Sequence, residues 1–175
     1  ISVLFVVASP VIQRWFVLRK DTISWDLRTR PALVDFRAVC TEIKNTVGQD
    51  PLWTMDASIP VEIGSPVSTR LTMGVFSFFP EATIEKSDRL HVLSLADPTG
   101  GADFSKTNWL LLSDWTFAVA GPGATRFPED ERIKLIDGLT ESFEKVQSWS
   151  DFGQDAGSLS LWRRTSPANE LGPSQ

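Results

Sequence analysis

The sequence predicts an α/β fold, a small three-layer sandwich with a short, mostly parallel sheet and a C-terminal β-hairpin. Three observations predict it. Residues 32–47 repeat apolar side chains at helical spacing, Leu52–Asp56 and Trp109–Asp114 are apolar runs that end in an acid, and Leu159–Arg164 follows a glycine-bearing loop. Strands that are apolar throughout suit a sheet that helices cover on both faces.

The chain divides into three parts. Its 175 residues predict one α/β domain at residues 31–164, preceded by residues 1–30 and followed by a polar, disordered tail at residues 165–175. Residues 1–8 are apolar apart from one serine and fit the end of a membrane-spanning helix, whose full length is roughly 20 residues, or a buried strand. The basic residues that follow suit a juxtamembrane linker, which either contacts anionic lipid headgroups or is simply solvated.

The first helix is predicted at Ala32–Val47. Its apolar residues recur at three- and four-residue steps on one face: Leu33, Phe36, Cys40, Ile43 and Val47. Pro31 suits the first turn and Gly48 suits a left-handed C-terminal cap. Cys40 lies on the apolar stripe, so we expect a small core residue rather than a nucleophile.

Two short helices are predicted between the apolar strands. Ile59–Ile63 forms one, and the polar segment Glu81–Arg89 forms the other. The glycines and proline of Pro98–Gly101 then indicate a loop before the second strand.

The C-terminal part is predicted to contain one helix and the hairpin. The helix runs from Pro128 to Val146, with acidic residues near its positive end. Its inner face carries four apolar residues: Ile133, Ile136, Phe143 and Val146. The strands Val146–Phe152 and Leu159–Arg164 then pair through the glycine-bearing loop between them.

Composition excludes several classes of function. The net charge of -5 argues against nucleic-acid binding, because proteins that neutralise phosphates are normally basic. One histidine and one cysteine are too few ligands for a dedicated zinc site, and His91 lacks a nearby nucleophile motif. No phosphate-binding glycine motif is present, so we expect no cofactor.

Two aspartates end the two apolar strands. Ligands bind at the carboxyl edge of the strands in open α/β sheets, so Asp56 and Asp114 are candidate ligand-binding residues. Such a pair can bind a metal, act as an acid–base pair or accept hydrogen bonds from sugar hydroxyls. Aspartate is also a common turn residue, and both side chains can instead cap or anchor loops.

The segment Arg70–Pro80 combines a cation with an unusual amount of apolar surface. Arg70 is a candidate partner for a phosphate, for Asp56 or for Glu62. Arg70, Asp56 and Glu62 are therefore candidate ligand-binding residues. Met73 and Phe76 are the candidate apolar contacts, as part of an adaptable surface that faces a prenyl chain or the membrane part of a larger protein. The alternative is that these aromatics close the core, with Phe76 inward and Phe79 at the rim.

The motif Met73-Gly-Val-Phe-Ser-Phe-Phe-Pro80 and the later Asp151-Phe-Gly-Gln154 resemble a known family. With Trp53–Asp56, Leu110–Asp114 and Leu159–Arg163, they resemble the C-terminal extracytoplasmic part of GT-C type membrane glycosyltransferases, the group that includes dolichyl-phosphate-mannose:protein mannosyltransferase-like enzymes. The resemblance extends over about residues 1–164 and consists mostly of pattern rather than long identity.

The resemblance implies a function for the whole protein. The chain would be a non-catalytic extracytoplasmic domain at the cell membrane, packed on the transmembrane part of the same protein and helping to bind a polyprenyl-phosphate-linked sugar donor or its acceptor. The family's catalytic acid lies in an early loop that this chain does not contain, so no catalytic residue is carried over. Two alternatives stay open: a stand-alone module that binds a small ligand or a protein at the Asp56 and Asp114 edge, and a small hydrolase that uses the same two acids.

Overall fold

The computed structural model describes residues 32–118, 127–152 and 157–165. The expected membrane segment and linker at residues 1–30, and residues 166–175 of the expected tail, lie outside the described residues. Thr165 belongs to the fold instead, because its N–H and its hydroxyl both donate to the carbonyl of Ser142, at 3.0 and 3.1 Å.

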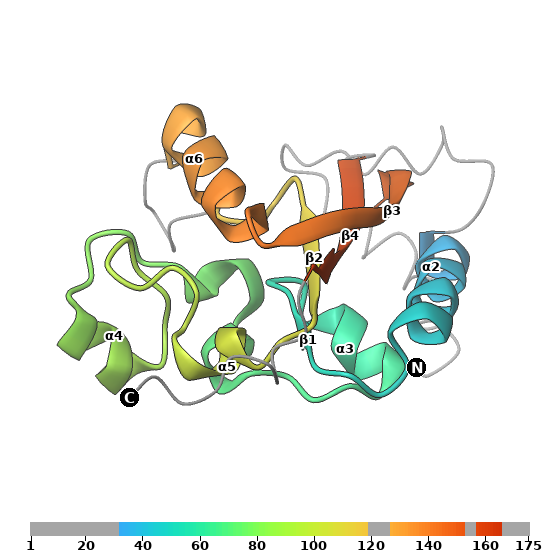
Figure 1. Ribbon diagram of the computed structural model, residues 1–175, viewed down its shortest axis with the longest axis horizontal. Helices are drawn as coiled ribbons and strands as arrows, with labels where there is room; N and C mark the ends of the chain where they lie inside the picture. The colour runs from blue at the N-terminus through green and yellow to red at the C-terminus, as the bar shows by residue number, and fades with distance from the viewer. Residues whose placement is uncertain (1–31, 119–126, 153–156, 166–175) are drawn as a thin grey trace, which may run out of the picture.

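Most of the helical segments lie between β1 and β2, and the described chain ends in two consecutive strands (Figure 1). The helices are α2 (Ala32–Val47), α3 (Ser58–Ile63), the 3-10 helices η2 (Thr69–Leu71) and η3 (Gly74–Ser77), α4 (Ile84–Leu90), α5 (Ala102–Ser105) and α6 (Glu129–Thr140). The strands are β1 (Leu52–Trp53), β2 (Trp109–Ser113), β3 (Phe143–Phe152) and β4 (Gly157–Arg164).

The strands form one four-stranded mixed sheet in the order β1-β2-β4-β3. β1 and β2 are parallel, whereas β4 pairs antiparallel with both β2 and β3. The predicted α/β class and C-terminal hairpin are confirmed, but the parallel part of the sheet is limited to β1 and β2. The hairpin places β4 antiparallel beside β2. The apolar sequence of β2 shows that both of its faces are covered, but it does not reveal whether its neighbours run parallel or antiparallel.

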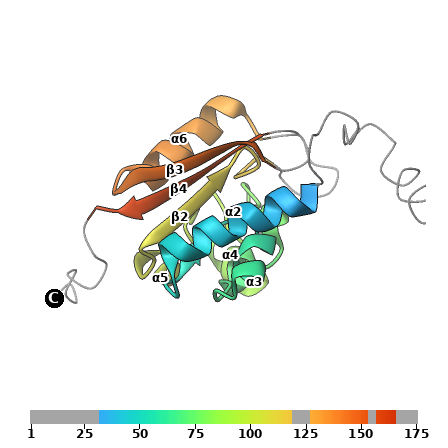
Figure 2. The ribbon, with the colours of Figure 1, turned by 90° about the vertical axis from the view of Figure 1, so that its right-hand side faces the viewer.

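Successive residues of the central strand β2 lie on opposite faces of the sheet. Trp109 and Leu111 pack with α2 and α3, whereas Leu110 and Leu112 pack with α6 and the buried Phe78. Figure 2 shows α2 and α3 on one side of the sheet and α6 on the other. The sheet is therefore the middle of three layers, and each layer buries its apolar side chains against it.

Helix α2 has the predicted bounds. Cys40, Ile43 and Val47 are buried, and Phe36 packs beside them, which is the predicted stripe. Burial, and secondarily the negative charge of Glu62, raises the pKa of the Cys40 thiol to about 11. Cys40 is therefore a protonated core residue at neutral pH, as expected.

The predicted helix from Pro128 to Val146 is too long. α6 ends at Thr140, and β3 begins at Phe143, which is buried and pairs with Arg164 of β4. Val146 is exposed at a register shift between Lys145 and Gln147, so it does not line a helix face. Its spacing from Phe143 coincides with the helical repeat, and this coincidence produced the error.

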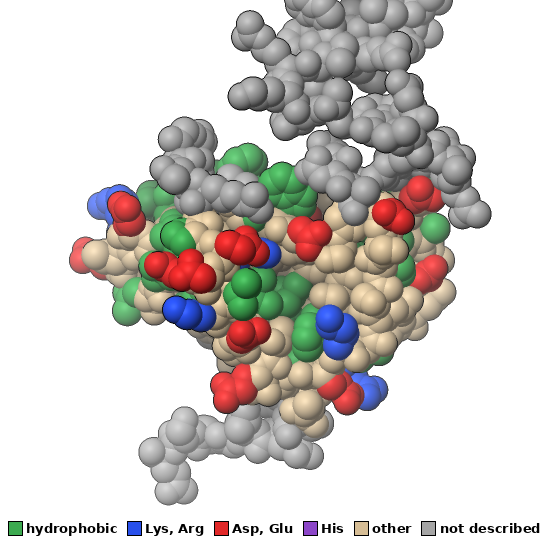
Figure 3. Space-filling view, turned by 90° about the horizontal axis from the view of Figure 1, so that it is seen from above, with side chains coloured by type: hydrophobic (Ala, Val, Ile, Leu, Met, Phe, Trp, Pro, Cys, Tyr) green, Lys and Arg blue, Asp and Glu red, His purple; other side chains and the backbone are tan. Residues whose placement is uncertain are grey.

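The α6 layer presents an acidic surface. Three acids occupy the first turn of α6, where their negative charges interact favourably with the positive end of the helix dipole: Glu129, Asp130 and Glu131. Seen from the α6 and β3 side, acidic groups are prominent around a central group of apolar side chains (Figure 3).

Candidate functional site at the carboxyl edge of β1 and β2

The chain leaves β1 and β2 toward opposite faces of the sheet. After β1 it enters α3, whose Ile59 and Ile63 pack in the cluster that contains α2. After β2 it reaches Phe117, which packs in the other cluster with Leu139 of α6. Where neighbouring parallel strands diverge in this way, ligands bind outside their carboxyl ends. We refer to this place as the carboxyl edge.

Asp56 lies at the carboxyl edge with one unsatisfied carboxylate oxygen. Its backbone is fixed, since its N–H donates to Oγ1 of Thr54 at 3.1 Å and its carbonyl accepts from the N–H of Ile59 at 3.0 Å. Its Oδ2 is buried and has no hydrogen-bond partner among the described residues. Most buried side-chain oxygens in native proteins have a partner, so an open carboxylate oxygen marks a candidate ligand contact.

The electrostatics of Asp56 come from burial and from one neighbour. Burial raises the pKa of its carboxyl, and a side-chain hydrogen bond with Ser113 opposes this by lowering it. Ser113 is the last residue of β2, and its N–H donates to Oγ1 of Thr116 at 2.9 Å in the tight turn that follows. Sequence reasoning missed Ser113, although it lies directly before the candidate Asp114.

Met73 and Phe76 lie on the segment that contacts the end of β1. A Cβ on Gly74 would be 3.1 Å from the carbonyl oxygen of Met55, so the backbone of this segment lies against the residue before Asp56. The side chains of Met73 and Phe76 are 58% and 44% exposed. They therefore offer apolar surface on the segment that adjoins the carboxyl edge.

The expected inward orientation of Phe76 is wrong. Phe76 is exposed rather than inward, and the inward aromatic is Phe78, which is fully buried against Phe117 with ring centroids 4.8 Å apart. Phe79 is only partly buried. Phe78 is fixed inward because its backbone forms a bridge with Leu93.

Asp114 lies at the same edge but has a partner of its own. Its carboxylate accepts hydrogen bonds from the N–H of Ser158 at 2.6 Å and from the Ser158 hydroxyl at 2.7 Å. Ser158 lies near the start of β4, so this contact joins β4 to the end of β2. Asp114 thus acts as a loop anchor, and the pKa of Asp56 is shifted by burial and Ser113 rather than by Asp114.

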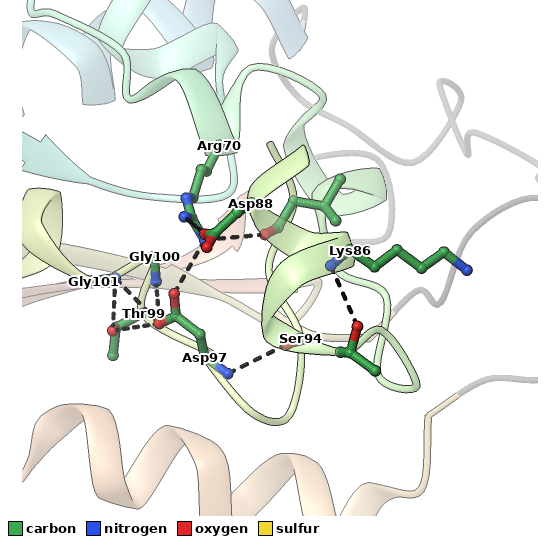
Figure 4. A network of polar contacts seen from close by, with 10 residues as sticks. Arg70, Lys86, Asp88, Ser94, Asp97, Thr99, Gly100 and Gly101 are labelled. Atoms are coloured by element: carbon green, nitrogen blue, oxygen red, sulfur yellow. Dashed lines mark hydrogen bonds and ion pairs between the residues drawn. The ribbon is translucent and has the colours of Figure 1, made fainter. Parts of the chain in front are cut away.

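Arg70 is neutralised inside the domain. Its side chain, 19% exposed, donates to Oδ2 of Asp97 at 3.1 Å and forms a second ion pair with Asp88 (Figure 4). Asp97 also accepts from the N–H groups of Gly100 and Gly101 through its other oxygen, at 3.0 and 3.1 Å. Arg70 therefore pairs with acids other than Asp56 and Glu62, and these ion pairs join η2 to α4 and to the loop before α5.

Glu62 lies apart from this arrangement. It is exposed on α3 and forms an ion pair of 3.6 Å with Arg37 of α2, which is also exposed. Exposed pairs of this kind contribute at most about 1 kcal/mol. Glu62 therefore joins two helices of one layer, away from the strand ends.

Within residues 32–118, 127–152 and 157–165, no helix has the length and apolar composition to cross a membrane. Over the same residues, no group of three or more histidine, cysteine or acidic side chains is arranged to hold a metal ion. Comparisons with protein families, curated proteins and solved structures return no match for this chain.

Proposed function

We propose that this chain is a non-catalytic, ligand-holding domain of a polyprenyl-phosphate-sugar-dependent membrane glycosyltransferase. In this proposal the carboxyl edge holds a hydroxyl of the donor sugar or of the acceptor. The domain would lie on the extracytoplasmic side of the cell membrane, against the transmembrane part of the same protein, which would supply the catalytic acid. The motifs around Met73–Pro80 and Asp151–Gln154 suggest the enzyme class.

One observation carries the proposal: the buried Oδ2 of Asp56 has no partner among the described residues. A hydroxyl that donates to this oxygen would satisfy it, and such bonds to a charged group are worth about 1.5–3 kcal/mol. Met73 and Phe76 add exposed apolar area, which suits contact with the hydrocarbon part of a lipid-linked sugar. Arg70 has no part in this proposal, because two carboxylates already neutralise it.

The test is binding of a two-isoprene polyprenyl-phosphate mannose to the protein, measured by calorimetry or by quenching of tryptophan fluorescence. Asp56→Asn should weaken binding by roughly 10- to 100-fold, the range that loss of a charged hydrogen bond predicts. The matched control is Asp137→Asn, which changes an exposed acid on α6. Equal affinity of the Asp56 variant and the wild type would overturn the proposal.

A second readout addresses the lipid part of the ligand. The double variant Met73→Ser/Phe76→Ser should weaken binding of the prenylated probe and leave binding of mannose 1-phosphate unchanged. Met73 is 58% and Phe76 44% exposed, so the variant should remain close to the wild type in stability.

A stand-alone module that binds a small ligand is the second candidate. The same observation favours it, because Asp56 and its partner Ser113 both belong to this domain. The prenylated probe and mannose 1-phosphate separate the two candidates. Equal affinity for both probes, lost in the Asp56 variant, would favour the stand-alone module.

A further inference from the structure

Basic charge is concentrated in the segment of residues 14–30, just before the described domain. Its charged side chains are five bases, Arg14, Arg19, Lys20, Arg28 and Arg30, and two acids, Asp21 and Asp26. Since the whole chain has a net charge of -5 and this segment +3, the remaining residues carry -8. The segment also contains the large apolar side chains Trp15, Phe16 and Trp25. The surface that complements it is therefore acidic and has an apolar centre.

The outward face of α6 has this character. Asp130, Ile133 and Asp137 follow one another at steps of three and four residues, so their side chains lie along one face of the helix. Ile133 is 48% exposed between the two acids. Lys134 is exposed as well, but the acids of α6 outnumber its bases by four to two. Figure 3 shows the same side of the molecule, with acidic groups around apolar side chains.

The acids of this face are available for a partner. Among the described residues, no side chain pairs with the carboxylates of Asp130 and Asp137, and only the backbone carbonyl of Asp137 accepts a hydrogen bond, from Thr140. Acids in the α2 layer differ in this respect. Glu42 accepts from Gln147 and Trp149, at 2.9 and 2.7 Å, and Glu62 pairs with Arg37. The α6 face is thus the better partner for a basic segment.

The start of α2 and the first turn of α6 lie at the same end of the sheet. Phe36 of α2 packs on Phe152 at the end of β3, with ring centroids 6.3 Å apart. At this end of the hairpin, Ser158 donates to the carboxylate of Asp114, whose carbonyl accepts from Arg132 of α6 at 3.4 Å. The hairpin end therefore adjoins both helices, which cover opposite faces of the sheet (Figure 2).

The chain that enters α2 is long enough to reach α6. Each helix packs roughly 10 Å from the sheet, so the two helices lie about 20 Å apart. An extended chain covers this distance in about six residues. More than half of residues 14–30 remains to contact α6, whose 12 residues make a helix about 18 Å long. The covalent link also raises the effective concentration of the segment at this face.

We propose that residues 14–30 bind the outward face of α6. The bases of the segment pair with Asp130 and Asp137, and its aromatic side chains cover Ile133. Each exposed ion pair contributes little, so binding needs several of them together with the apolar contact, and salt weakens it. The inference goes beyond the proposed function and does not depend on the ligand at the carboxyl edge.

The experiment places a nitroxide spin label on the segment in the whole chain, through Thr22→Cys. Cys40 is 2% exposed and stays unlabelled. The label broadens the NMR signals of backbone amides that lie near it. We expect broadening along residues 129–137 of α6 and none on α4. It should disappear when salt is raised to about 1 M, because the screening length then falls to about 3 Å.

Reversal of charge tests the contact from both sides. Asp130→Lys/Asp137→Lys should abolish the broadening of α6, and so should Arg19→Glu/Lys20→Glu. The second variant leaves the described domain unchanged, so its effect cannot come from a misfolded α6. Combining the two variants restores opposite charges and should restore the broadening.

The matched control is Glu81→Lys/Glu85→Lys, which reverses two exposed acids at and just before α4 and should keep the broadening of α6. Broadening on α4 in place of α6, broadening that neither reversal removes, or a control that acts like the α6 variant overturns the inference. A mixture of spin-labelled chains with unlabelled, nitrogen-15 chains tests for a second copy. Broadening of the nitrogen-15 chains would assign the contact to that copy and overturn the inference.

Absence of broadening on every described residue also overturns it. In that case, immobilisation of the label on vesicles of phosphatidylcholine and phosphatidylglycerol would identify anionic lipid as the partner of the segment. None of these outcomes bears on the proposed function, which is tested by ligand binding at Asp56.

Discussion

The carboxylate of Asp114 joins two strands through a single residue, Ser158, which donates to it from both its backbone N–H and its hydroxyl. The bond lies where β4 begins, next to Gly157. A Cβ on Gly157 would come within 2.7 Å of Oδ2 of Asp114, so the small residue at this position makes room for the anchor.

We predict that Asp114→Ala destabilises the protein by about 1–2 kcal/mol, because two hydrogen bonds to a charged group are lost. Gly157→Ala should also destabilise it, by displacing the carboxylate. In the Asp114→Ala background the cost of Gly157→Ala should largely disappear, since the displaced group is then absent. Urea unfolding of the two single variants and the double variant measures this coupling, and additive effects would contradict it.

Arg70 should be a stability residue. Arg70→Ala leaves Asp97 with little exposure and without its counter-charge, so we expect a loss of about 2–3 kcal/mol. Arg70→Lys should recover only part of this, because one ammonium cannot reproduce the forked contact with two carboxylates. The measurement is urea unfolding, with Arg89→Ala on the exposed side of α4 as the control. Equal effects of the two alanine variants would refute the role of the network.

Asp56 should make stability depend on pH. Its pKa is raised above the ordinary value of 3.8, so the folded state holds the proton more tightly than the unfolded state. The stability from this proton is fully present below pH 3.8 and is lost as pH rises through the folded-state pKa. Asp56→Asn cannot ionise, and its stability relative to the wild type should therefore rise over the same range and then level off. Unfolding curves from pH 3 to pH 8 test this, and a constant difference would contradict it.

Replacing Gly74 and Gly138 with alanine should change the stability of the protein in opposite directions. Gly74 has φ of 59° and its added Cβ would meet the Met55 carbonyl at 3.1 Å, so Gly74→Ala should cost about 1–2 kcal/mol. Gly138 lies within α6, and a Cβ there would contact nothing within 4 Å, so Gly138→Ala should stabilise by about 0.5–1 kcal/mol. Thermal unfolding measures both, and a shift of the same sign would disprove the contrast.

The sequence was sufficient where local patterns determine structure. The bounds of α2 followed from its apolar repeat and from a flanking proline and glycine. The run Trp109–Ser113 was recognised as a buried strand because helices cover it on both faces. The strand predicted at Leu52–Asp56 is too long, because β1 comprises only Leu52 and Trp53, but Asp56 still lies beyond the carboxyl end of β1.

Contacts between distant segments were not predictable in the same way. Arg70 pairs with acids 18 and 27 residues away, and no local pattern connects such positions. The 3-10 segment around Phe76 has no repeat long enough to indicate which aromatic points inward. Ser113, which lowers the pKa of Asp56, approaches it only because β1 and β2 pair in the folded sheet.

The two edges of the sheet determine how readily another copy of this protein can add a strand to it. β3 is one edge of the sheet, and its register shifts twice, between Lys145 and Gln147 and between Trp149 and Phe152. At the opposite edge, β1 is two residues long. A strand from another molecule needs a long, evenly spaced row of backbone donors and acceptors in order to add to a sheet. The register shifts of β3 and the shortness of β1 interrupt such a row in the described domain, which disfavours growth into stacked β-fibres.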